Sequence, residues 1–336
     1  MSTLTLKPSQ PTKGSGRSPA RSFRLTGDRE RLKRTAPAGV TFVALLAIII
    51  VCGVLQPVVF SATGLNLILS SIVPLVVAAL AQMVMMSIGD IDLGIGAFIG
   101  AVTTVAATFL SSSPLVGVLV LIALIAGYGV LGVLVHVRKV PSLIATLGAS
   151  FIWLGIALFV LPTPGGTAPS WLIDYASWTP TTFPTPIIPI IVITAIVFFV
   201  MQRAPLGADI RAFGSNPLAL QRSGVSTLRT RVTTYLIVGV LGVVAGLLLS
   251  SQIGGGDSSS ANSYTLVSVA AVILGGGAFT GGRAVAWGCM FGALTLGLVS
   301  VLLSLLDLSS NIQPAIQGGI VIAALAGRLF VEKVLK

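Results

Sequence analysis

The sequence contains few charged residues. Asp, Glu, Lys and Arg make up 9% of its 336 residues, whereas they make up about a quarter of a typical soluble domain. Since 54% of the residues are hydrophobic, the chain cannot cover a water-facing surface with charge, and most of that surface must face lipid. Its apolar runs suit transmembrane helices of about 20 residues better than the roughly 10-residue strands of a β-barrel. The sequence therefore predicts an all-α, polytopic membrane protein.

Residues that build catalytic and metal sites are also scarce. The only histidine, His136, ends an apolar run, and the two cysteines, Cys52 and Cys289, lie inside apolar runs. A lone histidine cannot form a His-type metal site, and these cysteines give no sign of a disulfide framework. The phosphate-binding pattern Gly-x-x-x-x-Gly-Lys-[Ser/Thr] is absent, so the chain is not expected to hydrolyse ATP itself. We predict no catalytic residue, metal ion or cofactor on this chain.

Ten candidate transmembrane helices divide the chain. They are 39–60, 65–88, 93–111, 114–136, 142–161, 186–202, 232–251, 264–278, 284–306 and 309–327. With ten spans, all 20 lysines and arginines fall on one face, which the positive-inside rule assigns to the cytoplasm together with both chain ends. The net charge of +11 therefore indicates orientation and gives poor support for nucleic-acid binding.

The spans leave polar segments at both faces. Residues 1–38 are basic and are predicted to be disordered, residues 39–330 form the transmembrane domain, and 331–336 form a cytoplasmic tail. The outer segment 162–185 holds five prolines and two tryptophans, and either lies along the membrane or forms a docking surface for an external partner. Both interpretations are open from the sequence.

The inner segment 203–231 is the longest between spans on its face. Asn216-Pro217 predicts the start of a short helix, with Asn216 as the N-cap and proline at the first helical position. Gly224 is expected to end that helix. Such a helix suits docking into the groove of a partner, although the pattern equally fits a solvated loop at the lipid surface.

The polar side chains inside the spans are mostly neutral. Buried charge is typical of ion-coupled carriers, yet the span centres here hold almost none. Gln82, Thr146, Gln313 and Gln317 are present instead, and the last two share a helical face because they are four residues apart. These groups either line a path for a polar, uncharged solute or form hydrogen bonds between helices.

Four stretches carry a resemblance to the ribose-type sugar permeases of bacterial ABC importers, which are relatives of the branched-chain amino-acid permeases. They are GDIDLGIG (89–96), VPSLIATLG (140–148), AFGSNPLA (212–219) followed by Ser223-Gly224, and GGGAFTGGR (275–283). Their order and spacing agree with the family. The chain departs from it at Asp90, where the family has glycine, at Gly94 in place of serine, and at Leu220 in place of alanine.

The resemblance implies a non-catalytic permease subunit that moves a monosaccharide across the bacterial inner membrane. Its implied partners are an ABC ATP-binding subunit, which binds the ATP, a periplasmic solute-binding protein, and a second permease subunit, identical or homologous. The residues expected at the ATPase contact are Arg211, Gly214, Asn216, Ala219 and Gly224. Alternatives are a permease for amino acids or another small polar solute, an ion-coupled secondary carrier, and a membrane scaffold without transport.

The stretches 89–96 and 275–282 look like a faint internal repeat, since glycines match at the first and last positions. Glycine-interrupted spans in corresponding positions point to a transport path, although tight turns explain them as well. The glycines expected to break helices are Gly89, Gly96, Gly275, Gly276, Gly281 and Gly282.

Asp92 stands where the family has its acid, and we expect it to cap the N-terminus of the following span at a break beside the path. Together with Thr146, Gln313 and Gln317 it is a candidate path residue. Asp90 is the unusual acid, and its replacement by glycine is expected to be mild.

Overall fold

The computed structural model describes residues 41–180 and 183–306, together with Gly39 and a few single residues between 312 and 322. Apart from those single residues, the predicted span 309–327 lies outside the described part, and so do Gln313 and Gln317, the segment 1–38 and the tail 331–336. All helices described below belong to one compact unit, Pro37–Lys336.

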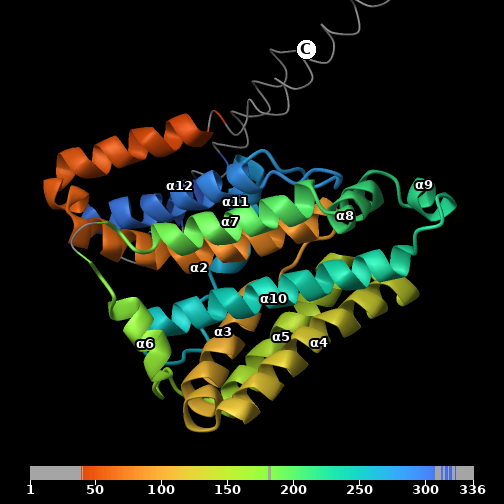
Figure 1. Cartoon of the computed structure of the whole chain (residues 1–336), viewed down its shortest axis with the longest axis horizontal. Helices are drawn as coiled ribbons and strands as arrows, with labels where there is room; N and C mark the ends of the chain where they lie inside the picture. Colours follow the sequence, from red (N-terminus) through yellow and green to blue (C-terminus); the bar gives the residue numbers. More distant parts are fainter. Residues whose placement is uncertain are drawn as a thin grey trace, which may run out of the picture. The chain divides into compact units, whose positions relative to one another are not determined.

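The described part of the chain is helical (Figure 1). An apolar helix over Thr41–Leu55 comes first. It is followed by η1 (Pro57–Phe60), α2 (Ala62–Ser87), α3 (Ile95–Val105), the π-helical η2 (Ala106–Leu110), α4 (Pro114–Arg138), α5 (Ser142–Val160), α6 (Ser170–Ser177), α7 (Ile187–Gln202), α8 (Pro205–Ser215), α9 (Pro217–Arg222), α10 (Thr227–Ile253), α11 (Tyr264–Leu274) and α12 (Ala286–Leu305). The one extended pairing among these residues is an antiparallel bridge between Gly165 and Gly256.

Five described helices are long and apolar enough to cross a membrane: α2, α4, α5, α10 and α12. A sixth candidate is α7 taken with α8, although the two are bent by 68°. The helices Thr41–Leu55, Ile95–Leu110 and Tyr264–Leu274 are apolar but shorter. The predicted all-α, multi-pass class is confirmed, whereas the ten-span topology stays a prediction.

Helix α10 joins two groups of helices, as Figure 1 shows. On one side it packs on α3 and α4, and α3 in turn packs on α5. On the other side it packs on α2, which also contacts α7, α11 and α12. Residues at the start of α10 are therefore placed between both groups.

The burial pattern separates an inner helix from outer ones. Every residue of α2 from Ile72 to Ser87 is buried, as expected of a helix that is apolar on all sides and lies in the core. Helix α5 buries only a stripe, Thr146, Ala149, Trp153 and Ala157, at helical spacing. Its other side presents Phe151, Ile152 and Phe159, so that face suits contact with lipid or another apolar surface.

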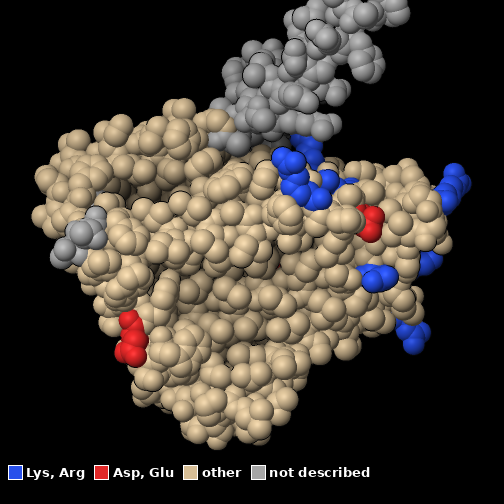
Figure 2. All heavy atoms as spheres, viewed as in Figure 1, with Lys and Arg blue, Asp and Glu red and all other residues tan. Residues whose placement is uncertain are grey.

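Basic side chains gather at one end of the described helices. In the view of Figure 2, lysines and arginines lie over α8 and α9 and the neighbouring helix ends, while an acidic side chain marks the opposite end near α6. This end holds Arg203, Arg211, Arg222, Arg229, Arg231 and Arg283 in or beside helix termini. This is the distribution that the positive-inside rule expects of a cytoplasmic end, and the orientation itself stays a prediction.

Candidate functional site

Residues 88–94, called the 88–94 break, connect α2 and α3 without helical structure. Gly89 turns the chain with a φ of +83°, a conformation that residues other than glycine rarely adopt. The exposed backbone groups of the break are bound by α5: the Leu93 N–H donates to Thr146 Oγ1 (3.0 Å), and the Ile91 N–H donates to Ser142 Oγ (3.3 Å). The break is therefore an ordered turn that neighbouring helices stabilise.

Asp92 is the buried carboxylate of this break, with 1% of its surface exposed. Its Oδ1 accepts the Gly94 N–H (2.7 Å) immediately before α3 begins, which agrees with the predicted capping role. Its Oδ2 accepts the hydroxyl hydrogen bond of Tyr128 on α4 (2.6 Å). In the amide orientation that satisfies both of its ends, Gln82 on α2 donates to the Asp92 carbonyl and accepts the Asp92 N–H, each over 3.2 Å.

Burial dominates the electrostatics of Asp92. Loss of water raises the pKa of this carboxyl to about 6, because desolvation penalises the charged form. The hydrogen bonds from Tyr128 and from the backbone of Gly94 and Ile95 oppose that rise in pKa. A carboxyl with these properties changes its charge near neutral pH.

Asp90, at the other end of the break, is also buried, with 7% exposed. Its Oδ2 lies 3.3 Å from Arg231 Nε and accepts the Tyr235 hydroxyl hydrogen bond (3.1 Å). Burial raises the pKa of Asp90, while the positive charge of Arg231 and the hydrogen bonds of Tyr235 and Ser142 lower it. The sequence ranked Asp90 below Asp92, but in the structure both carboxylates bind side chains from other helices.

A second break, residues 275–285, separates α11 from α12 and faces the first. Gly276, Gly281 and Gly282 adopt positive φ angles of +96°, +77° and +75°. The Gly282 N–H donates to the Ser87 carbonyl at the end of α2 (2.8 Å), which joins the two glycine turns directly. The two stretches that the sequence compared therefore meet in space.

Of the predicted break glycines, Gly96 lies inside a helix and Gly275 stands at the boundary between α11 and the second break. Gly96 lies in the first turn of α3, where a side chain would meet the Ala261 carbonyl and Thr265 Oγ1, so it serves close packing. Gly275 ends α11 against the carbonyl of Gly288. The remaining four predicted glycines lie in the turns themselves.

The inner segment is more helical than predicted. Helix α8 occupies Pro205–Ser215, and α10 begins at Thr227, five residues before the expected position. The reason is local: Pro205 starts α8, whose buried residues Gly207, Ile210 and Phe213 repeat every three positions and form an inner face. Residues 205–222, α8 and α9 together, are called the α8–α9 segment below.

The predicted short helix is confirmed as α9. The Asn216 side chain accepts the Ala219 N–H (3.0 Å), which is the predicted N-cap, and Gly224 follows the helix with a φ of +85°. Asn216, Ala219 and Gly224 are exposed. Arg211 is half-buried on α8, and its Nη1 has no acceptor among the described residues.

Gly214 faces inward, unlike the other predicted contact residues. A side chain there would collide with the Ser87 carbonyl and the Gly282 nitrogen, so bare backbone of α8 touches the second break and, at Ser87, the end of α2 immediately before the first break. The α8–α9 segment is thus in direct contact with the second break and with the end of α2.

Thr146 is fully buried. Its Oγ1 accepts the Leu93 N–H of the 88–94 break and donates to the Ser142 carbonyl of its own helix, α5, over 2.9 Å. Three participants were not identified from the sequence: Tyr128, Tyr235 and Arg231. A signal was present, because the chain has only four tyrosines, and three of them, Tyr128, Tyr235 and Tyr264, lie within predicted spans. Among the described residues no cluster of His, Cys, Asp and Glu could hold a metal ion.

Comparisons with known proteins identify the family to which the chain is similar. A family model described as "Branched-chain amino acid transport system / permease component" matches residues 64–325. The ribose import permease protein of Haemophilus influenzae is 27% identical over 294 residues, covering 84% of this chain and 90% of the relative. The D-allose transport system permease protein of Escherichia coli is 24% identical over 295 residues (85% and 90%). The autoinducer 2 import system permease protein of Salmonella paratyphi A is 26% identical over 291 residues (83% and 87%). No solved structure matches the chain significantly.

Proposed function

The chain belongs to the permease-component family of branched-chain amino acid transport systems, and on that premise we propose that it is the membrane-spanning subunit of an ATP-driven importer of a sugar. The relatives named for ribose, allose and autoinducer 2 favour a monosaccharide or a solute of similar size and polarity. ATP binding and hydrolysis are assigned to a separate ATP-binding subunit, so this chain is non-catalytic and binds no cofactor.

The observation that carries this proposal is the position of the α8–α9 segment. Its outer part is a short, capped helix on the basic end of the molecule, with Asn216, Ala219 and Gly224 exposed. Its inner part, at Gly214, lies against the second break and the end of α2. A partner that binds α9 would therefore act on a segment that contacts the second break and the end of α2 beside the first break.

The ATP-binding subunit is proposed to bind this segment through Asn216, Ala219 and Gly224. Arg211 contributes a guanidinium whose Nη1 has no acceptor among the described residues, and it is suited to a carboxylate of the partner. Gly214 supports the contact from inside, because its lack of a side chain allows α8 to approach the turns.

The transport path is proposed to run beside the 88–94 break. Backbone groups outside helices need hydrogen-bond partners when they are buried, and Asp92 and Thr146 supply them here. Gln313 and Gln317 are proposed to complete the path, in a pair of permease subunits that form it together.

The topology proposed for this function has ten spans with both ends in the cytoplasm, in the bacterial inner membrane. The end with α6 then faces the periplasm and receives a solute-binding protein. Trp171 and Trp178 are exposed there, at 56% and 55%, as expected for interfacial or docking residues.

An uptake assay tests the solute class. Cells that lack the gene for this chain are compared with complemented cells for uptake of radiolabelled D-ribose, D-allose and L-leucine. Loss of monosaccharide uptake that the gene restores is expected. Loss restricted to L-leucine would instead establish the second candidate, an amino-acid permease, which the description of the family favours. Unchanged uptake of all three would contradict both.

A further inference from the structure

A cation and an anion that are 141 positions apart in the sequence are paired beside the 88–94 break. Arg231, in the first turns of α10, places Nε 3.3 Å from Asp90 Oδ2, and its Nη2 donates to Oδ1 over 3.4 Å. Tyr235, one turn further along α10, donates its hydroxyl to the same carboxylate. The break is therefore attached to α10 by charge as well as by hydrogen bonding.

Arg231 has a second contact, on the α8–α9 segment. The centre of its guanidinium lies 5.1 Å from the centre of the Phe213 ring, a distance at which the cation interacts with the aromatic face. Phe213 is 3% exposed and belongs to the inner face of α8. One guanidinium thus touches both the segment proposed to bind the ATP-binding subunit and the break.

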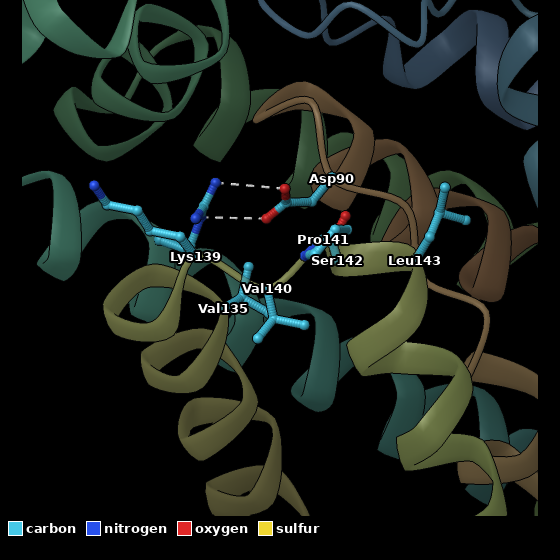
Figure 3. Close-up of a pocket in the computed structure, with 8 residues that line it drawn as sticks. Asp90, Val135, Lys139, Val140, Pro141, Ser142 and Leu143 are labelled. Atoms are coloured by element: carbon cyan, nitrogen blue, oxygen red, sulfur yellow. Dashed lines mark hydrogen bonds and ion pairs between the residues drawn. The ribbon is translucent and has the colours of Figure 1, made fainter.

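A cavity of about 360 Å³ opens beside this ion pair, lined by Asp90, Val135, Lys139, Val140, Pro141, Ser142, Leu143 and Arg231. Figure 3 shows Asp90 at its edge with the ion pair drawn as dashed lines, while Lys139 points away from that carboxylate. Tightly packed interiors resist side-chain movement. The cavity leaves space for the ion pair to shift as a unit without displacing the core.

The contact at Gly214 and the ion pair between Arg231 and Asp90 differ in the direction of movement that they can transmit from α8. Bare backbone at Gly214 lies against Ser87, the residue before the break, and against Gly282, so α8 can push the end of α2 there but cannot pull it. An ion pair resists separation, and the Arg231 side chain is only 18% exposed, so solvent screens the pair less than it screens a surface pair. Movement in both directions needs such an attractive link.

We propose that Arg231 is a positioning residue for transport, whose ion pair with Asp90 transmits displacement of the α8–α9 segment to the 88–94 break. The inference rests on the proposed function, because the displacement comes from the ATP-binding subunit. When α8 moves, the Arg231 guanidinium moves with Phe213, and the 88–94 break moves with Asp90.

The test uses the complex of this chain with its ATP-binding subunit and solute-binding protein, reconstituted in proteoliposomes. Uptake of D-ribose or D-allose and hydrolysis of ATP are measured in the same vesicles, and their ratio is compared among variants. The variants are Arg231→Gln, Asp90→Asn, their combination, and the conservative Arg231→Lys. Arg229→Gln is the matched control, since it changes an exposed arginine two positions earlier on the same helix.

We expect Arg231→Gln to lower uptake per ATP by about tenfold or more, while assembly and ATP hydrolysis stay within about twofold. Arg231→Lys should recover much of the ratio, and Arg229→Gln should keep it. The double variant should be no worse than either single one, since both remove the same link.

Two results would overturn the inference. If Arg231 were purely structural, its loss would lower complex yield, uptake and hydrolysis together and leave the ratio of uptake to hydrolysis unchanged. Additive losses of this ratio in the double variant would show that the two residues do not form one link. If the unmodified complex took up neither sugar, the proposed function itself would be refuted.

Discussion

The hydroxyl of Tyr128 on α4 donates a hydrogen bond of 2.6 Å to Oδ2 of Asp92, and both residues are buried. The Tyr128 ring also meets Phe98 edge-on, at 4.7 Å between ring centres, and stacks on Trp153 at 5.9 Å. The contact therefore connects the start of α3 to α4 and α5. Its consequence is that Asp92 is held inside the protein and does not face the membrane surface.

Replacing Tyr128 with phenylalanine should destabilise the protein. The ring contacts remain, but Asp92 Oδ2 loses its partner while buried, and an unsatisfied buried polar group costs about 1–3 kcal/mol. Thermal unfolding of the detergent-solubilised protein at pH 7 measures the loss. Tyr175→Phe serves as the control because Tyr175 is 38% exposed. Equal unfolding temperatures for both variants would show that the hydrogen bond contributes nothing.

Asp92 should make the stability of the protein depend on pH. Its pKa is raised from 3.8 to about 6, so between these values the folded state binds more protons than the unfolded state. The stability contribution is fully present below pH 4 and is lost as pH rises through 6, to an extent on the order of 3 kcal/mol. Asp90 acts in the same direction, because its pKa is also raised.

The measurement is the unfolding free energy as a function of pH for the unmodified protein and for Asp92→Asn, which does not titrate. The difference in stability between the two should shift in favour of the variant from pH 4 to pH 7. A difference that stays constant over this range would contradict the raised pKa.

Gly214→Ala should weaken the contact of α8 with the end of α2 and the second break. The added Cβ would collide with the Ser87 carbonyl and the Gly282 nitrogen, both of them backbone atoms that cannot rotate away. We expect a destabilisation of about 1–3 kcal/mol, as for other overpacked sites. Gly148→Ala, within helix α5 and with no atom near the new Cβ, should be neutral or stabilising by about 0.5–1 kcal/mol. Thermal unfolding compares them, and similar behaviour of the two variants would refute the close contact.

Asn216→Ala should impair binding of the ATP-binding subunit more than it impairs folding of the whole chain. The variant removes the side chain that caps α9, and loss of an N-cap costs about 1 kcal/mol, localised here in an exposed helix of six residues. Co-purification of the two subunits measures binding. Asn262→Ala, an exposed asparagine outside the α8–α9 segment, is the control. Undiminished co-purification with Asn216→Ala would argue against a docking role for α9.

Structural features that depend on neighbouring residues, such as helix starts and ends, could be predicted from the sequence. Asn216-Pro217 and Gly224 predicted α9 correctly, because capping and glycine conformations depend on neighbouring residues. The predicted span 142–161 agrees with α5, Ser142–Val160, for the same reason: proline precedes it and a continuous apolar run defines its length. The all-α class followed from composition.

Contacts between side chains that lie far apart in the sequence could not be predicted from it. Arg231 was counted only as an orientation signal, since nothing near it in the sequence indicates a carboxylate 141 positions away. The interpretation of Asp90 as the less important acid came from a family pattern, whereas its partners come from α10. Helix α8 was missed because its inner face is short and contains a glycine, so its apolar periodicity is weak.

Reconstitution tests the central claim most directly. The chain is incorporated into proteoliposomes alone, and also together with its ATP-binding subunit and solute-binding protein, and uptake of radiolabelled D-ribose and D-allose is measured with ATP or with an imposed proton or sodium gradient. We predict uptake only in the complete complex, dependent on ATP and unaffected by the gradient. Uptake by the chain alone, driven by an ion gradient without ATP, would contradict an ATP-driven permease and establish a secondary carrier.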